Sequence, residues 1–122
     1  MTTVPGRIEF TKYSIASLLD QTRRVDEIRI YIPYISSKGV LYVIPKWMSD
    51  LSKNIKHFKI KRCEKDWGPA TKIIPAVLEC VNEEIDSIIY VDDDMIYNKN
   101  MVETLIFYSK KYPHYAICKG RM

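Results

Sequence analysis

The chain has 122 residues, a length that suits one domain, and we expect a single unit over residues 1–122. Hydrophobic residues make up 47% and charged residues 28% of the sequence, which excludes an intrinsically disordered chain. The net charge of +4 would help to attract a phosphorylated ligand, but it does not by itself indicate nucleic acid binding.

The sequence predicts a cytoplasmic protein. No apolar run approaches the roughly 20 residues of a membrane span, and we expect neither a transmembrane segment nor a signal peptide. The three cysteines, Cys63, Cys80 and Cys118, are odd in number and far apart. This pattern favours reduced thiols over a disulfide framework.

The first half of the chain predicts two strands and a helix. Residues 1–4 resemble the end of a strand that the following Pro-Gly pair stops. Apolar side chains at helical spacing predict a helix over 8–22. The segment "EIRIYIP" (27–33) alternates isoleucines with polar residues and predicts a strand. Residues 34–57 remain ambiguous, with a short apolar piece and a helical turn near Trp47.

The second half alternates strands with helices. Strands are expected at 57–61, at 87–91, where β-branched residues make the strongest case, and at 115–118. Helices are expected at 70–82, with a kink or restart at Pro75, and at 99–111. This order predicts an α/β fold with a Rossmann-like, mostly parallel sheet and helices on both faces.

Three consecutive carboxylates follow the apolar segment "IIYV" at its carboxyl end, where parallel sheets bind their ligands. In an extended chain Asp92 and Asp94 point the same way and Asp93 points the other way. Two carboxylates about 5 Å apart repel by roughly 3 kcal/mol at an effective dielectric of 20. Because Mg²⁺ or Mn²⁺ would reverse that repulsion and leave positions for a diphosphate, Asp92 and Asp94 are candidate metal ligands.

The acidic run has other interpretations. One is a solvated acidic turn, which the preceding apolar segment disfavours. Another is a calcium loop from Asp92 to Glu103, which fails because Tyr97 stands where that loop requires glycine.

A second motif, "DWGPATK" (66–72), precedes the acidic run. Gly68 and Pro69 predict a turn, and the helix that begins at Ala70 would offer backbone N–H groups to a phosphate. Lys72, one turn into that helix, could add a positive charge to the same ligand.

The motifs "DWGPATKIIP" and "IIYVDDDMIY", in this order, resemble those of GT-A-fold glycosyltransferases. The resemblance is to small sugar-transferase-like proteins with a D-x-G-P-A-T-K motif before an I-Y-x-D-D-D-I-x-Y motif. The segments "TTVPGRIEF", "SIASLLDQ" and "IPYISSKGVLYVIPKWMSDL" also resemble that family, so the likeness covers nearly the whole chain. It implies transfer of a sugar from a nucleotide-diphosphate donor, with a UDP-sugar expected, to an unknown glycan or protein acceptor.

The resemblance also implies roles for individual residues. Asp94 would bind Mn²⁺ or Mg²⁺ directly, and Asp92 would face the ribose or the water of the metal. Asp93 would belong to the donor site in a less defined role. Lys72 would approach the diphosphate or the sugar, and Asp66 the base or the ribose.

The opening loop completes the implied donor site. Thr2, Thr3 and Pro5 would line the nucleotide pocket, and Arg7 would reach the base or the phosphates. The catalytic base stays unknown, because neither His57 nor His114 is well placed in the sequence for that role.

The chain departs from the family pattern at both ends, so the resemblance implies the donor-binding half of a transferase, incomplete at both ends. A partner domain could complete it, and an exposed sheet edge would favour self-association. Two alternatives stay open. One is a noncatalytic nucleotide- or metal-binding half-domain. The other is a basic RNA-binding domain, suggested by Lys53, Lys56, Lys59, Lys61, Arg62 and Lys65 interleaved with His57 and Phe58.

Overall fold

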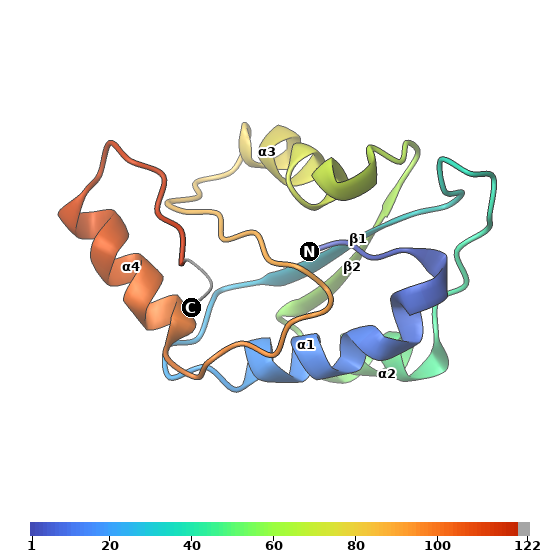
Figure 1. Cartoon of the computed structure of the whole chain (residues 1–122), viewed down its shortest axis with the longest axis horizontal. Coiled ribbons are helices and arrows are strands. Elements are labelled where there is room, and N and C mark those ends of the chain that lie inside the picture. Colours follow the sequence, from blue (N-terminus) through green and yellow to red (C-terminus); the bar gives the residue numbers. More distant parts are fainter. Residues whose placement is uncertain (120–122) are drawn as a thin grey trace.

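The computed structural model describes residues 1–119. The elements follow one another as η1 (Pro5–Phe10), α1 (Thr11–Leu19), β1 (Ile28–Pro33), α2 (Lys46–Asn54), β2 (Phe58–Cys63), η2 (Gly68–Lys72), α3 (Ile74–Cys80) and α4 (Met101–Lys111). Figure 1 shows β1 and β2 in the middle of the molecule, with α1 and α2 on one side and α3 on the other.

The sheet consists of β1 and β2, which pair in parallel from Ile28 opposite Phe58 to Pro33 opposite Cys63. The beginning of the chain extends this sheet on the other edge of β1. Thr2 forms a parallel bridge with Tyr31, and the backbone N–H of Tyr31 donates to the carbonyl of Met1 at 2.9 Å. Residues that follow these three parallel segments therefore emerge at the same end of the sheet.

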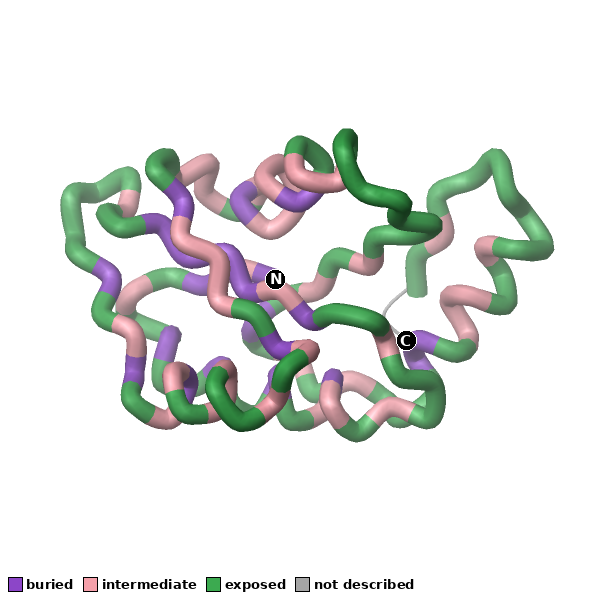
Figure 2. Tube along the Cα trace, turned by 180° about the vertical axis from the view of Figure 1, so that it is seen from behind, coloured by how far each residue is buried: buried purple, intermediate pink, exposed green. Residues whose placement is uncertain are grey.

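The strands bury their alternate residues on opposite faces, as a strand period of two requires. Ile28, Ile30 and Ile32 enter a large core, while Tyr31 faces away from it. The large core joins helices α1, α2 and α4 to the sheet through Ile15, Leu18, Met48, Phe58, Met101 and Val102. Figure 2 shows buried stretches along the central segments of the chain, while the outer loops are exposed.

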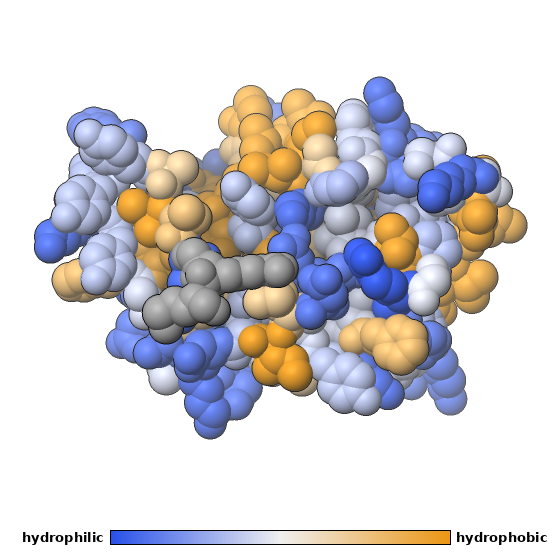
Figure 3. Space-filling model, viewed as in Figure 1, coloured by the Kyte–Doolittle hydropathy of each residue, from blue (hydrophilic) through white to orange (hydrophobic). Residues whose placement is uncertain are grey.

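A much smaller core lies on the α3 face, where Tyr31, Cys63 and Ala76 are buried together. Arg29 strengthens this face, because its guanidinium pairs with Glu79 at 2.8 Å and with Glu83 at 3.0 Å. Figure 3 shows apolar side chains exposed over α3. Helices thus cover both faces of a parallel sheet, which confirms the predicted α/β class at that level.

The predicted strand over 87–91 is wrong. Within residues 1–119 the backbone of this segment forms no hydrogen bond with a neighbouring strand. Its side chains do alternate: Ile89 and Val91 pack against the large core, while Ile88 and Tyr90 are exposed. A strand also needs a partner edge, and both edges of β1 are already used, by β2 and by residues 1–3.

The predicted strand over 115–118 is also wrong. These residues follow a turn in which the backbone N–H of Tyr115 donates to the carbonyl of Tyr112, and the Tyr115 side chain is exposed. An apolar run forms a strand only where a neighbouring chain can pair with it. The described residues provide no such neighbour at this place.

The other predicted elements are confirmed with shifted bounds. The helix expected at 8–22 is α1, preceded by the 3-10 turn η1, which begins at Pro5 because a fixed φ suits the first helical position. The helix expected at 70–82 is divided into η2 and α3, with Pro75 in the first turn of α3. The ambiguous region 34–57 contains α2 and a small antiparallel bridge between Ile35 and Leu41.

Two further predictions concern the compartment. Among the helices of the described chain, none has the length and hydrophobicity that crossing a membrane requires. Cys63, Cys80 and Cys118 are all free thiols, with Cys63 buried and Cys118 exposed. The cytoplasmic location stays a prediction.

Candidate functional site

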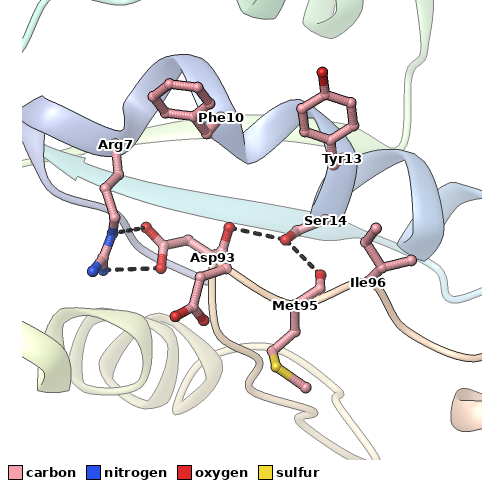
Figure 4. Close-up of a pocket in the computed structure, with 8 residues that line it drawn as sticks. Arg7, Phe10, Tyr13, Ser14, Asp93, Met95 and Ile96 are labelled. Carbon is pink, nitrogen blue, oxygen red and sulfur yellow. Dashed lines mark hydrogen bonds and ion pairs between the residues drawn. The ribbon is translucent and has the colours of Figure 1, made fainter.

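The acidic run lies beside the N-terminal segment, and its middle residue is buried. Asp93 is 6% exposed and accepts three side-chain hydrogen bonds. Thr3 Oγ1 donates to Asp93 Oδ2 at 2.6 Å, and Arg7 donates to both carboxylate oxygens, from Nε at 3.2 Å and from Nη2 at 3.0 Å. Figure 4 shows the bidentate contact between the Arg7 guanidinium and the Asp93 carboxylate. Asp93 therefore ties the loop after the first segment to the acidic turn.

Helix α1 forms hydrogen bonds with the backbone of the same turn through two serine side chains. The buried Ser14 hydroxyl lies 2.9 Å from the Asp93 carbonyl and 2.6 Å from the Met95 carbonyl, so it donates to this pair (Figure 4). One turn later, Ser17 Oγ accepts the backbone N–H of Tyr97 at 2.9 Å. Small hydroxyl residues spaced three apart on α1 thus position residues 93–97.

The two outer carboxylates, Asp92 and Asp94, are exposed on either side of the buried Asp93. Lys72 Nζ donates to Asp92 Oδ1 at 2.6 Å, which brings the end of η2 to the acidic run. Asp94 forms no side-chain hydrogen bond or ion pair with any residue in 1–119. The structure thus joins the two sequence motifs through Lys72 and leaves one carboxylate available.

The Tyr97 hydroxyl fixes the backbone of Asp92. It accepts the Asp92 N–H at 2.7 Å and donates to the Asp92 carbonyl at 3.0 Å. Burial raises the pKa of Tyr97 to about 12, and the nearby carboxylates of Asp92, Asp94 and Asp93 act in the same direction. The phenol therefore stays protonated and remains a donor at neutral pH.

Asp66 organises the turn that carries Lys72. Its Oδ1 accepts the Gly68 N–H at 2.8 Å and the Thr71 hydroxyl at 3.2 Å, and its Oδ2 accepts the Ser37 N–H at 2.8 Å. Gly68 has a φ of +62°, in the left-handed region that glycine adopts without strain. The hydrogen bonds of Asp66 thus go to the protein itself, and its role near the base or the ribose of a donor stays a prediction.

The remaining predicted donor residues lie in the first segment and at the start of η1. Thr2 Oγ1 donates to the Tyr31 carbonyl at 2.7 Å, and Pro5 begins η1. The Thr3 carbonyl accepts the hydroxyl of Tyr42 at 2.9 Å. Burial, followed by the charges of Asp66 and Asp93, raises the pKa of Tyr42 to about 12. Sequence reasoning missed Tyr42 because it belongs to the ambiguous region.

The donor set for a cation consists of two carboxylates. Mg²⁺ and Mn²⁺ prefer carboxylate oxygens, and Mg²⁺ is commonly held by one or two carboxylates together with substrate phosphates. Asp92 and Asp94 fit that requirement in type and number. Residues 1–119 contain no group of three or more His, Cys, Asp or Glu side chains that could hold a metal ion. A metal ion at Asp92 and Asp94 would therefore need further ligands, such as substrate phosphates.

A pocket of about 320 Å³ opens between α1 and residues 93–96. Its lining is mostly apolar and aromatic, and comprises Phe10, Tyr13, Met95 and Ile96 with Arg7, Ser14, Asp93 and Asp94 (Figure 4). Sequence reasoning missed Phe10 and Tyr13. The available signal was their spacing of three, which places two aromatic rings on one side of a helix.

Comparisons with known proteins add nothing to this geometry, since no family model, no curated protein and no solved structure matches the chain.

Proposed function

We propose that this chain is the donor-binding half of a GT-A-type glycosyltransferase with a Rossmann-like fold. It would bind a nucleotide-diphosphate sugar, with UDP as the expected nucleotide, together with Mn²⁺ or Mg²⁺. The observation that carries the proposal is the 2.6 Å contact between Lys72 and Asp92, beside the exposed carboxylate of Asp94. The ammonium group of Lys72 lies next to two exposed carboxylates that could hold a divalent ion. A diphosphate could then bind to the lysine and to the metal ion together.

The position of these residues supports the same proposal. Asp66 and Lys72 follow β2, while Thr3 and Arg7 follow the parallel segment at the start of the chain. In α/β sheets, ligands bind beyond the carboxyl ends of the parallel strands. The candidate residues gather at that end.

In this proposal each residue has a defined task. Lys72 leaves Asp92 and donates to the diphosphate, where its positive charge stabilises the charge that develops on the leaving group. Asp92 and Asp94 hold the metal ion, which when bound supplies Lewis-acid stabilisation of that same charge. Asp93, Ser14 and Tyr97 keep the turn in place, so that the two outer carboxylates need not be ordered on binding.

The acceptor and the catalytic base lie outside this assignment. His57 precedes β2 whereas Asp66 follows it, so the length of the strand, about 20 Å at 3.3 Å per residue, separates that imidazole from the site. The proposal therefore assigns donor binding to the chain and expects turnover only with an acceptor-binding partner.

Calorimetric titration of UDP into the purified chain, with and without Mn²⁺, tests this function. We expect metal-dependent binding that Asp94→Asn weakens by about tenfold or more, a loss of about 1.4 kcal/mol. Asp50→Asn is the matched control, because it makes the same change on α2, away from the site.

Three results would decide against the donor site or refine it. Binding that needs neither metal nor Asp94 would refute the metal assignment. Failure of a folded chain to bind UDP, GDP and the other nucleoside diphosphates would refute the donor site. Metal-dependent binding of UDP, with neither transfer nor hydrolysis of UDP-glucose even when an acceptor-binding partner is supplied, would identify a noncatalytic nucleotide-binding module.

A further inference from the structure

We propose that the outer edge of β2 is a docking site for an extended, acidic segment of another protein, which adds to the sheet as a further strand. The proposal is independent of the donor site, and it assigns a role to the basic stretch that the donor site leaves unused. Within the described chain β1 lies between β2 and residues 1–3, so β2 has a paired neighbour on one side only. An edge of this kind can accept another strand through backbone hydrogen bonds.

The hydrogen bonds of β1 show which backbone groups of β2 point outward. Ile28 donates its N–H to the His57 carbonyl at 2.8 Å, and Tyr34 donates its N–H to the Cys63 carbonyl at 3.1 Å. In a parallel pair every second residue of a strand bonds to the same neighbour. The odd-numbered residues of β2 therefore bond to β1, and the even-numbered residues direct their N–H and C=O groups to the outer edge.

Two of these outward residues lack partners. Phe58 is satisfied within the chain, because its N–H donates to the Ile55 carbonyl at 3.1 Å and its carbonyl accepts the Ser52 hydroxyl at 3.4 Å. The backbone groups of Ile60 and Arg62 form no hydrogen bond on the outer side with any residue in 1–119. Ile60 and Arg62 thus offer two N–H and two C=O groups to an added strand.

The charges beside this edge attract an acidic partner. Residues 53–65 contain six cations and a single carboxylate, that of Glu64. In the described structure none of the six forms an ion pair, whereas Arg29 on the neighbouring β1 pairs with three glutamates. Side chains on adjacent strands contact each other directly, and opposite charges at such positions are stabilising. Lys59 and Lys61 would therefore pair with carboxylates on the added strand.

The two faces of β2 define the side-chain pattern of the partner. Successive side chains of a strand alternate between faces. Lys59 and Lys61 share the face of Cys63, which is buried in the small core, while Ile60 packs against the large core on the other face. An added strand would place acidic residues next to the lysines and apolar residues next to Ile60. The edge therefore suits a segment in which acidic and apolar residues alternate.

The same lysines disfavour a second copy of this chain at the edge. If two β2 strands paired antiparallel with Ile60 opposite Ile60, Lys59 of each copy would lie opposite Lys61 of the other. Like charges directly opposite each other are destabilising, and lysine on an edge strand is a common protection against self-pairing. Charge thus favours an acidic partner over self-association at this edge.

The aromatic residues near the edge favour a peptide over RNA. Single-stranded nucleic acids bind to basic grooves by stacking their bases on aromatic faces. The Arg62 guanidinium lies 4.5 Å from the centroid of the Tyr34 ring, and the Lys65 ammonium lies 5.5 Å from that of the Trp67 ring. These cations already cover one face of each ring, and RNA would leave the unpaired backbone groups without partners.

NMR of the isotope-labelled whole chain tests the proposal with the peptide acetyl-Glu-Val-Glu-Val-Glu-Val-Glu-amide. We expect the saturating peptide to slow hydrogen exchange of the Ile60 and Arg62 amides at least tenfold, because both become hydrogen-bonded. The Lys61 amide, which already bonds to β1, is the internal reference. Two control peptides should not bind: the lysine-valine counterpart, and the acidic peptide with every backbone nitrogen methylated.

Charge reversal on the protein provides a matched pair of variants. The double variant Lys59→Glu, Lys61→Glu should bind the acidic peptide at least tenfold more weakly. The double variant Lys110→Glu, Lys111→Glu makes the same change at exposed positions of α4 and should bind it as the wild type does. Circular dichroism establishes that both are folded. The two oppositely charged peptides test charge selection on the wild type, so the answer does not depend on the variants.

Four results would overturn the proposal. Binding that leaves exchange of the two amides unchanged, or that the methylated peptide reproduces, would mean charge attraction without strand addition. Equal binding of the acidic and basic peptides, or binding of neither, would exclude an edge that selects acidic strands. Protection of the same amides that rises with protein concentration alone would assign the edge to a second copy. Binding of a decauridylate RNA in place of the acidic peptide would identify a nucleic acid surface.

Discussion

Replacement of Asp93 by asparagine separates the buried carboxylate from its exposed neighbours. The side chain of Asp93 lies within the protein and accepts the Thr3 hydroxyl at 2.6 Å. A hydrogen bond to a charged group contributes about 1.5–3 kcal/mol. The contact with Arg7, whose side chain is 55% exposed, adds only about 0–1 kcal/mol because water screens it. The introduced asparagine would keep only one acceptor oxygen. Its amide group would then face either the Arg7 guanidinium, which can only donate, or the Thr3 hydroxyl, which would have to turn its own proton elsewhere.

We therefore expect Asp93→Asn to lower the free energy of unfolding by about 2–3 kcal/mol. For a chain of this length that loss corresponds to a midpoint about 10 °C lower. Urea unfolding followed by circular dichroism measures the change, and Asp94→Asn is the control at the adjacent position. Asp94 has no side-chain partner in the described structure, so its replacement should change stability by less than about 0.5 kcal/mol.

The reasoning is refuted if the two asparagine variants have unfolding free energies within about 0.5 kcal/mol of each other. That result would mean that the burial of Asp93 and its contacts with Thr3 and Arg7 contribute nothing net to the fold. The complementary result for ligand binding is part of the same prediction, since Asp94→Asn should impair metal-dependent UDP binding in a chain of normal stability.

Three further predictions follow from the ion pairs and the histidine. Lys72→Ala should weaken UDP binding by about tenfold and uridine binding hardly at all, and calorimetry showing equal losses would contradict its role at the diphosphate. Arg29→Met should destabilise the chain by about 2 kcal/mol, since it removes a largely buried guanidinium and leaves the partly buried Glu79 without its cation. Lys99→Ala breaks an exposed 3.5 Å pair, and its thermal unfolding should match that of the wild type. Burial and the guanidinium of Arg24 lower the pKa of His57 below 6.5. The unfolded chain therefore binds a proton at His57 more readily than the folded chain does. The contribution of neutral His57 to stability is complete above pH 6.5 and is lost as the pH falls through the lowered pKa. NMR titration of the imidazole should show that pKa rising in Arg24→Gln; an unchanged value would exclude the influence of Arg24.

Local patterns predicted the elements whose stability depends on local features. The alternation of Ile28, Ile30 and Ile32 predicted β1, and apolar spacing predicted α4. The expectation that Asp93 points away from Asp92 and Asp94 agrees with the burial of Asp93 alone. The sequence could not predict that Asp93, and not Asp92 and Asp94, would be buried. The hydrogen-bond donors that bind Asp93 are Thr3 and Arg7, which lie about 90 residues earlier in the chain.

The failures have the same physical origin. Residues 87–91 have the alternation of a strand, but pairing depends on a partner edge that no local pattern reveals. The pocket escaped prediction because its walls come from η1, α1 and residues 93–96, which only the tertiary fold brings together. Sequence motifs identified Lys72 and the acidic run, while the contact between them required the structure.

The unequal cores on the two faces of the sheet divide the molecule into units of different local stability. The small core holds η2 and α3 through few buried side chains, whereas α1 and residues 93–97 are attached to the large core. Regions with few buried apolar contacts open at a lower free energy than the rest of a protein. We therefore expect the amides of α3 to exchange with solvent sooner than those of α1. The segment η2, which carries Lys72, can then move to admit a ligand, while the turn that contains Asp93 stays in place.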